Sequence, residues 1–298
     1  MEKWNASHIA DQTGKTAVVT GANSGIGFET AKALAAKNAT VIMACRNTGK
    51  AEVAAQAIRN ALPQAQIRVM ALDLSSLASV RAFAENALTH FPVIDLLINN
   101  AGVMVPPFSK TQEGFELQMG TNHLGHFALT GLLMEAVEAA PKGRIVAVTS
   151  SAHWFGKIDF SDLHWEKRKY SAWGAYGASK IANLYFIAHL SQRLERKGSP
   201  VICASAHPGW TATELQRHTG FTRFLNPMFS QNAAMGALPT LYGACGPDVV
   251  PNQLFAPDSW FEMRGYPTRV NPTKRARDLG AAARLWDISE ALTQVSFP

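Results

Sequence analysis

Cysteine is scarce in this chain, with three among 298 residues. Cys45, Cys203 and Cys245 are odd in number, widely spaced and not arranged as CxxC, which argues against both a disulfide framework and a zinc site. Unpaired cysteines suit a reducing compartment. The sequence therefore predicts a cytoplasmic protein with no bound metal.

Long apolar runs are also missing. Residues 1–8 do not resemble a signal peptide, and no later segment offers about 18 uninterrupted apolar residues, so no membrane span is expected. The formal net charge is +6, but basic residues are spread along the chain, apart from residues 167–169 and a cluster between Arg264 and Arg277. We interpret them as solvated surface that attracts small anionic ligands, and we expect no nucleic-acid partner.

Short β-branched runs alternate with longer segments in which apolar residues recur at helical spacing. This alternation is typical of repeated βαβ units, in which helices cover both faces of a parallel sheet. Strands are expected at residues 16–20, 40–44, 66–72, 94–99, 144–149, 201–206 and 253–255. Helices are expected at residues 25–37, 48–61, 77–91, 114–140, 172–197 and 232–245. The sequence therefore predicts one α/β domain over residues 1–298, a doubly wound Rossmann fold with about seven parallel strands.

Two segments interrupt the regular pattern. Residues 210–232 and 257–271 are rich in Trp, Phe, Met and Pro. Because irregular aromatic segments often border ligand cavities, we expect them to form the lid and a wall of a substrate pocket.

A glycine-rich loop, TGANSGIG at residues 20–27, lies between the first strand and the first helix. Gly21 permits a tight turn, Gly25 lets the backbone approach phosphates, and Gly27 allows close packing of the helix. The helix N-terminus then offers free amides and the positive end of its dipole to a pyrophosphate. A dinucleotide site is predicted, and its other members in this loop are Asn23, Ser24 and Ile26.

The residue after the second strand indicates which dinucleotide is bound. An acid there usually holds the 2′-hydroxyl of NAD, but this chain has Arg46. A guanidinium can stack on adenine and pair with a 2′-phosphate, and Lys50 can assist from the next helix. NADP is therefore expected in preference to NAD. The alternative interpretation of Arg46 is a solvated loop residue.

Two more strand ends reach the same groove, because an open α/β sheet binds its ligands at the carboxyl ends of its strands. After the third strand, Asp73 can accept from the adenine amino group, with Leu74 beside it. After the fourth, the small residues of NNAG let the backbone approach a ribose. The predicted contacts there are Asn100, Ala101 and Gly102.

Tyr176 and Lys180 are four residues apart on a predicted helix and so share one face. A nearby ammonium stabilises a phenolate, which would let Tyr176 exchange a substrate proton while Lys180 binds the ribose of a nicotinamide cofactor. A hydroxyl must also hold the substrate oxygen. Ser151, just past the fifth strand, is preferred, and Ser150 is the alternative.

Asn122 falls inside a predicted helix, although asparagine is a poor helix former. From there it could link Lys180 to solvent through water. His123, His126 and His207 could be proposed as metal ligands, but no third ligand accompanies them, so structural or pocket-lining roles are favoured.

Together these motifs resemble the short-chain dehydrogenase/reductase superfamily over essentially the full chain. The resemblance is carried by TGANSGIG, NNAG, Asn122, Ser151, YGASK at residues 176–180 and HPGWTAT at residues 207–213. It implies a catalytic tetrad of Asn122, Ser151, Tyr176 and Lys180. It also implies that the nicotinamide is bordered by Pro208, Gly209, Thr211 and Thr213.

Residues 43–47, and the 25 positions from Ser151 to Tyr176, resemble the retinol dehydrogenase-like and protochlorophyllide reductase-like branch. That branch usually uses NADP and acts on bulky apolar carbonyls or alcohols. Aromatic residues in the gap either form one wall of a hydrophobic pocket or cover the core. They are His153, Trp154, Phe155, Trp165 and Trp173.

The resemblance has limits. The N-terminal anchor of membrane-bound retinol dehydrogenases is not expected here, and Trp210 replaces the cysteine that follows Pro-Gly in light-dependent protochlorophyllide reductase. We expect an NADP(H)-dependent oxidoreductase that interconverts a small lipophilic aldehyde or ketone and its alcohol. The alternatives are a non-catalytic NADP-binding sensor or scaffold, or a reductase of a C=C bond. Residues 114–140 and 172–197 often form the dimer face of the superfamily, yet this branch includes monomers, so either a monomer or a homodimer is expected.

Overall fold

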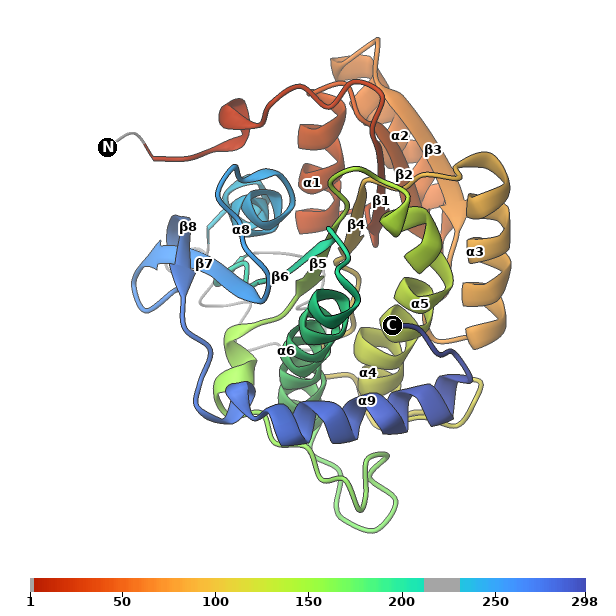
Figure 1. Cartoon of the computed structure of the whole chain (residues 1–298), viewed down its shortest axis with the longest axis vertical. Helices are drawn as coiled ribbons and strands as arrows, with labels where there is room; N and C mark the ends of the chain where they lie inside the picture. Colours follow the sequence, from red (N-terminus) through yellow and green to blue (C-terminus); the bar gives the residue numbers. More distant parts are fainter. Residues whose placement is uncertain (1–2, 212–230) are drawn as a thin grey trace.

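The computed structural model describes residues 3–211 and 231–298. In this part of the chain eight strands form one sheet, in the order β3-β2-β1-β4-β5-β6-β7-β8 (Figure 1). The strands are β1 (Thr16–Thr20), β2 (Thr40–Cys45), β3 (Gln66–Ala71), β4 (Leu96–Asn99), β5 (Arg144–Val148), β6 (Ile202–Ala206), β7 (Gln253–Ser259) and β8 (Arg264–Val270). Strands β1 to β7 pair in parallel, and β8 pairs antiparallel with β7.

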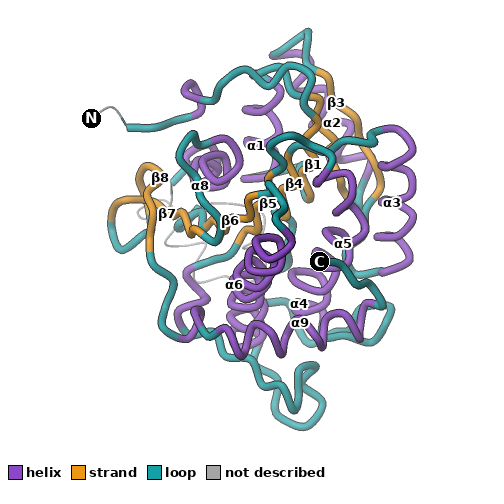
Figure 2. Tube along the Cα trace, in the orientation of Figure 1, coloured by secondary structure: helices purple, strands orange, loops and turns teal. Residues whose placement is uncertain are grey.

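Helices cover both faces of the sheet (Figures 1 and 2). One face carries α1 (Gly25–Ala35), α2 (Thr48–Ala61) and α8 (Ala233–Cys245). The other carries α3 (Leu77–His90), α5 (Gly125–Glu138) and α6 (Ala172–Lys197), with α9 (Leu279–Thr293) lying across the last two. Short helical turns are η1 (Ala6–His8), α4 (Leu117–Met119), η2 (Gly120–Leu124), η3 (Ser151–Trp154) and η5 (Arg275–Arg277). The expected doubly wound fold is confirmed.

The central strands are buried on both faces, so successive residues enter opposite cores. Val18 packs toward α3, α5 and α6, while its neighbour Val19 packs toward α1, α2 and α8. This two-sided burial explains why the strands read as continuous apolar runs.

Residues 257–271 were expected to be irregular, and that prediction was wrong. They form most of the β7–β8 hairpin, so the sheet has an antiparallel edge strand beyond the seven parallel ones. Strand β8 contains Gly265 and Pro267 and is partly exposed along its length, because it lies at the edge of the sheet. It therefore lacks the alternating apolar pattern that marks an ordinary strand.

Helix α9 was also not predicted. The side chain of Asp278 accepts a hydrogen bond from the backbone N–H of Ala281 and starts the helix. One face is buried, and Trp286 is only 2% exposed, packed against the rings of Phe127 and Phe297. The C-terminal residues thereby tie themselves to α5.

The helix expected at residues 114–140 begins later, at Leu117, and is not continuous. A π-helical turn, η2, replaces one α-helical turn and contains Asn122. Such turns alter the direction of side chains locally and often occur at functional sites.

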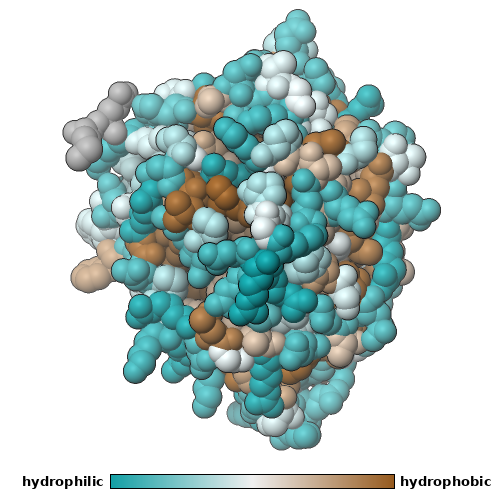
Figure 3. Space-filling view, viewed as in Figure 1, coloured by the Kyte–Doolittle hydropathy of each residue, from teal (hydrophilic) through white to brown (hydrophobic). Residues whose placement is uncertain are grey.

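Polar side chains cover most of the face shown in Figure 3, and apolar ones form small separate patches. Among the described residues, no helix combines the length and apolar character that crossing a membrane requires. Of the segment expected as a lid, residues 212–230 lie outside the described residues.

Candidate active site

A cavity of about 580 Å³ opens where β1 to β6 end. Nearly all the residues predicted for the site line it. These are Gly21, Asn23, Ser24, Gly25, Ile26, Gly27, Arg46, Lys50, Asp73, Leu74, Asn100, Ala101, Gly102, Ser150, Ser151, Tyr176, Lys180, Pro208, Gly209 and Thr211. Asn122 lies behind the lining, and Thr213 lies outside the described residues.

At three positions of the loop a residue other than glycine would be strained or would collide with its neighbours. Gly21 and Gly25 have φ angles of 66° and 56°, which residues with a Cβ rarely adopt. A Cβ on Gly27 would lie 2.4 Å from the carbonyl oxygen of Gly21 and 2.5 Å from Nδ2 of Asn100. The loop is therefore held in one backbone path against the loop after β4.

Helix α1 begins at this loop without a side-chain cap. The side chains of Asn47, Ser76, Ser171, Asn232 and Asp278 each accept a backbone N–H at the start of α2, α3, α6, α8 and α9, respectively. Ser24 occupies the same position before α1 but makes no such bond. The first amides of α1 thus face the cavity as donors, which is the arrangement that binds a phosphate.

Cationic side chains lie near this end of the cavity. Arg46 and Lys50 are exposed and line it, and Arg46 has no ion-pair partner among the residues that the structure describes. Asp73 uses Oδ1 to accept from the backbone and hydroxyl of Ser75, at 2.9 and 2.6 Å. Its other carboxylate oxygen remains for a ligand.

The opposite end of the cavity is built on contacts between β5 and α6. The Thr149 hydroxyl donates to the carbonyl of Lys180 at 2.8 Å, and Lys180 Nζ donates to the carbonyl of Val148 at 3.1 Å. Asn183 donates to the same carbonyl at 3.0 Å. These bonds fix the position of α6 along the end of β5. They thereby also fix Tyr176, which precedes Lys180 by one helical turn.

Asn122 holds the loop after β4. Its Oδ1 accepts from the N–H of Val103 at 2.8 Å, and its Nδ2 donates to the Val103 carbonyl at 3.0 Å and to the Ser179 hydroxyl at 2.9 Å. The amide thus connects the π-helical turn to both that loop and α6.

The serine that meets Tyr176 is Ser150. A hydrogen bond from the Ser150 side chain lowers the pKa of Tyr176, whereas burial, the larger effect, raises it to about 12. Ser151, the preferred residue at the sequence level, also lines the cavity but begins η3, where the chain turns away from the strand. The contact with Tyr176 therefore favours Ser150, the alternative, over Ser151.

Burial also lowers the pKa of Lys180 to about 8. Its Nζ lies 5.7 Å from the centre of the Tyr176 ring. The expected lowering of the tyrosine pKa by this ammonium is not observed: burial dominates the pKa, so Tyr176 is a protonated phenol in the free chain.

The aromatic segment between Ser151 and Tyr176 divides in two. Phe155 and Trp173, at its ends, line the cavity together with Met104, Trp210 and Met263. Trp165, in its middle, stacks against the guanidinium of Arg168 at 3.7 Å instead. The pocket-wall interpretation is therefore supported at the two ends of the segment, while Trp165 packs within its own loop and does not cover the core.

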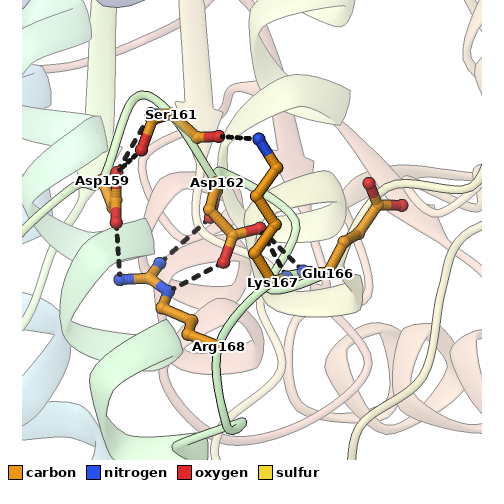
Figure 4. A network of polar contacts seen from close by, with 6 residues as sticks. All are labelled: Asp159, Ser161, Asp162, Glu166, Lys167 and Arg168. Atoms are coloured by element: carbon orange, nitrogen blue, oxygen red, sulfur yellow. Dashed lines mark hydrogen bonds and ion pairs between the residues drawn. The ribbon is translucent and has the colours of Figure 1, made fainter.

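The middle of that segment is held by charges (Figure 4). Arg168 pairs with Asp159 at 3.5 Å and with the nearly buried Asp162 at 3.3 Å. Asp162 also accepts from the backbone N–H of Glu166 at 2.7 Å. This loop is organised internally, and its two ends supply the aromatic wall.

The histidines considered as metal ligands make other contacts. His123 pairs with the hydroxyl of Ser289 on α9, and His207 Nδ1 accepts from the N–H of Gly209 at 3.1 Å. Among the described residues, no three His, Cys, Asp or Glu side chains are grouped so as to hold a metal ion. Thr20 and His126 are further functional candidates: the sequence pattern gave Thr20 no role of its own and favoured only a structural or pocket-lining role for His126. Neither lines the cavity, and only the contacts described below reveal them.

The family model described as short chain dehydrogenase matches residues 15–222. The chain therefore belongs to the short-chain dehydrogenase/reductase superfamily, and it is an oxidoreductase of that family.

Retinol dehydrogenases are among its relatives. Human retinol dehydrogenase 12 is 44% identical over 279 residues, which cover 93% of this chain and 85% of that protein. Human retinol dehydrogenase 13 is 40% identical over 294 residues, covering 96% and 86%. A crystal structure of an uncharacterized protein from Mycobacterium paratuberculosis is 43% identical, covers the whole of both chains and superposes with a TM-score of 0.85. The retinol dehydrogenase-like branch is thus confirmed.

Buried histidines make the fold sensitive to acid. Burial lowers the pKa of His123 to about 3, of His126 to about 4 and of His207 to about 3. Between pH 6.5, where these groups protonate in the unfolded chain, and about 4, the unfolded chain binds more protons than the native one. The free energy of unfolding should therefore fall as the pH is lowered through this window.

Urea titrations at a series of pH values measure this dependence. The His123→Gln variant should reduce its slope by about one proton, or about 1.4 kcal/mol per pH unit. An unchanged slope in this variant would contradict the assignment of His123 as a buried neutral group.

Proposed function

We propose that the protein is an NADP(H)-dependent oxidoreductase that interconverts a lipophilic aldehyde or ketone and its alcohol. The observation that carries this proposal is one continuous cavity with two different ends. At one end are Tyr176, Ser150 and Lys180, and at the other are the uncapped amides of α1 and Arg46. A dinucleotide that reacts at its nicotinamide end and carries its phosphates farther along would suit a cavity with a proton donor at one end and anion-binding groups at the other.

The residues present fit such a cofactor. The path of the glycine loop leaves room for phosphates beside the start of α1, and Arg46 supplies a charge for a 2′-phosphate. Lys180 would bind ribose hydroxyls, and Pro208, Gly209 and Thr211, which line the same cavity, would border the nicotinamide. When bound, the nicotinamide supplies or accepts a hydride.

Tyr176 provides the proton. Because its pKa is raised to about 12, the phenol is protonated at neutral pH and can donate to the carbonyl oxygen during reduction. Ser150 holds that oxygen through its hydroxyl, and the Lys180 ammonium stabilises the phenolate that remains. In the oxidising direction Tyr176 must first lose its proton to solvent, and the phenolate, stabilised by the Lys180 ammonium, then accepts the proton of the alcohol.

The substrate class follows from the lining near Tyr176. Phe155, Trp173 and Met263 contribute apolar surface there, whereas the charged lining residues other than Lys180 lie toward the adenine end. Aromatic and thioether side chains favour an apolar ligand. Its relatives named retinol dehydrogenases support a lipophilic alcohol or aldehyde as substrate.

We also propose that the chain is a monomer. The outer sides of α5 and α6, which often form the dimer face in this superfamily, carry α9 here. A C-terminal segment occupies the position that a second chain would need: a Cβ on Gly131 of α5 would lie 2.5 Å from the Phe297 ring.

A cytoplasmic location stays a proposal. It is supported by the three cysteines, all free thiols, of which Cys45 and Cys203 are buried.

The first test is Tyr176→Phe, which removes the proton donor and keeps the ring. Turnover of aldehydes and alcohols should fall by about 10²-fold to 10⁴-fold, with the dissociation constant for NADPH unchanged. Tyr185→Phe is the matched control: this residue is buried on the same helix, and its hydroxyl donates to the carbonyl of Arg275 instead. Equal activity in the two variants would refute the role of Tyr176.

The second test concerns cofactor choice. Arg46→Ala should weaken binding of NADPH by about tenfold to a hundredfold and that of NADH much less, because both cofactors lose adenine stacking but only the phosphorylated one loses a charged hydrogen bond. Arg68→Ala, on an exposed arginine of β3 away from the cavity, is the control. Fluorescence titration with both nucleotides measures the change, and equal weakening of both would contradict the NADP assignment.

Oligomeric state can be measured by light scattering coupled to size exclusion. The mass should equal that of one chain, 32.3 kDa, across a wide range of protein concentration. A stable dimer would show that α9 does not block association, or that another face is used.

A further inference from the structure

His126 lies outside the cavity, buried between the π-helical turn and the end of β1, and is 2% exposed. Its Nδ1 lies 3.0 Å from the carbonyl oxygen of Asn122, and its Nε2 lies 2.9 Å from the hydroxyl of Thr20. Because a carbonyl can only accept, Nδ1 carries the proton of the neutral ring. Nε2 then presents a lone pair, and the Thr20 hydroxyl donates to it.

The Thr20 hydroxyl is fully used in this arrangement. Its oxygen accepts the backbone N–H groups of Asn100 and Ala101, each at 2.9 Å. Its proton can go to His126 at 2.9 Å or to the carbonyl of Ile98 at 3.3 Å, and the shorter contact is the better one. A neutral imidazole thus orients the hydroxyl that holds the loop after β4.

The same loop returns to His126 along a second path. Three residues after Asn100, both backbone groups of Val103 pair with the side chain of Asn122, whose own carbonyl binds His126. The hydrogen bonds therefore form a closed ring that passes through Thr20, the loop of residues 100–103, Asn122 and His126. This ring joins the end of β1, the end of β4 and the π-helical turn.

The ring requires an uncharged histidine. Burial is the main cause that lowers the pKa of His126; the hydrogen bond to the Asn122 carbonyl raises it in part, and the nearby Lys180 ammonium lowers it again. A second ring proton would point an N–H at the Thr20 oxygen, which already accepts two others. The neutral form is therefore the one present at physiological pH.

The loop of residues 100–103, which is part of this ring, passes close to Lys180. A Cβ on Gly102 would lie 3.1 Å from Asn122 Oδ1 and 3.6 Å from Lys180 Nζ. The loop passes so close to both groups that a small shift of its backbone alters the space where a cofactor ribose meets the lysine. Misplacement of about 1 Å can lower a rate by about 10²-fold.

We propose that His126 is a positioning residue that, by bridging Asn122 to Thr20, sets the place of the loop of residues 100–103 relative to Lys180. This proposal rests on the proposed function, because its consequence is the alignment of cofactor and proton donor. His126 itself touches neither.

Variants that remove one or both hydrogen bonds test the bridge. His126→Leu removes both, His126→Asn can keep a donor near Asn122, and His126→Gln can keep an acceptor near Thr20. We expect His126→Leu to lower kcat by about tenfold to a hundredfold and to weaken NADPH binding. His126→Asn and His126→Gln, which each keep one hydrogen bond, should lose less of both kcat and NADPH affinity. Steady-state rates with a carbonyl substrate give kcat, and fluorescence titration gives the dissociation constant for NADPH.

A double-mutant cycle tests the route through Thr20. Thr20→Val removes the hydroxyl, and Thr20→Ser retains it. The losses from His126→Leu and Thr20→Val should be strongly non-additive, since both break the same ring. The single variant Thr20→Ser, which keeps the hydroxyl, should retain most of the wild-type kcat.

His123→Leu is the matched control, because His123 is equally buried but binds Ser289 on α9. It should lower the melting temperature about as much as His126→Leu while leaving kcat and NADPH affinity near wild type. If His126→Leu behaves in the same way, or if the cycle with Thr20→Val is additive, the positioning role is wrong. If His126→Leu does not fold, His126→Asn and His126→Gln give the same comparison with one bond intact.

A wild-type protein that binds NADPH but reduces no carbonyl would contradict the proposed function alone. NADPH affinity across the His126 and Thr20 variants would still decide the proposal, since a bridge that places the loop must alter binding of the ribose that the loop borders. Unchanged affinity throughout that series would overturn it.

Discussion

The end of β1 lies beside the end of β4, and the arrangement of the whole site depends on this adjacency. The order of the sheet reverses here: the chain first adds β2 and β3 on one side of β1 and then places β4 on the other. The connections after β1 and β4 therefore leave toward opposite faces, and a crevice opens between them. The glycine loop forms one side of that crevice and the loop of residues 100–103 forms the other, so the residues proposed for phosphate binding and for proton chemistry line one cavity.

Much of the fold could be predicted because the inner strands are buried on both faces. Strands such as β1 and β5 must be apolar throughout, and their neighbours in sequence are helices that begin with recognisable caps, such as Asn47 and Ser76. The elements that escaped prediction are those whose sequence is governed by other constraints. Strand β8 lies at an edge, and α9 contacts helices rather than the sheet, so neither carries the pattern of a βαβ unit.

The site could be predicted to a similar depth, and for a related reason. Glycines that must exclude a Cβ, and a tyrosine and lysine separated by one helical turn, are visible in the letters themselves. The choice between Ser150 and Ser151 is not, because it depends on where β5 ends and η3 begins, and a shift of one residue reverses which hydroxyl meets Tyr176. The ring through His126 was hidden for another reason: its members are separated by up to about a hundred residues and meet only after the sheet has formed.

Ser24 stands at a capping position without capping, and this has a consequence for the energetics of the free protein. A serine there ordinarily contributes about 1 kcal/mol to its helix, so the first turn of α1 forms without a stabilising contact that five other helices have. Local opening of that turn should be the easiest motion in the helix. An anion bound at these amides would supply the missing cap, so ligand binding would also stabilise the first turn of α1.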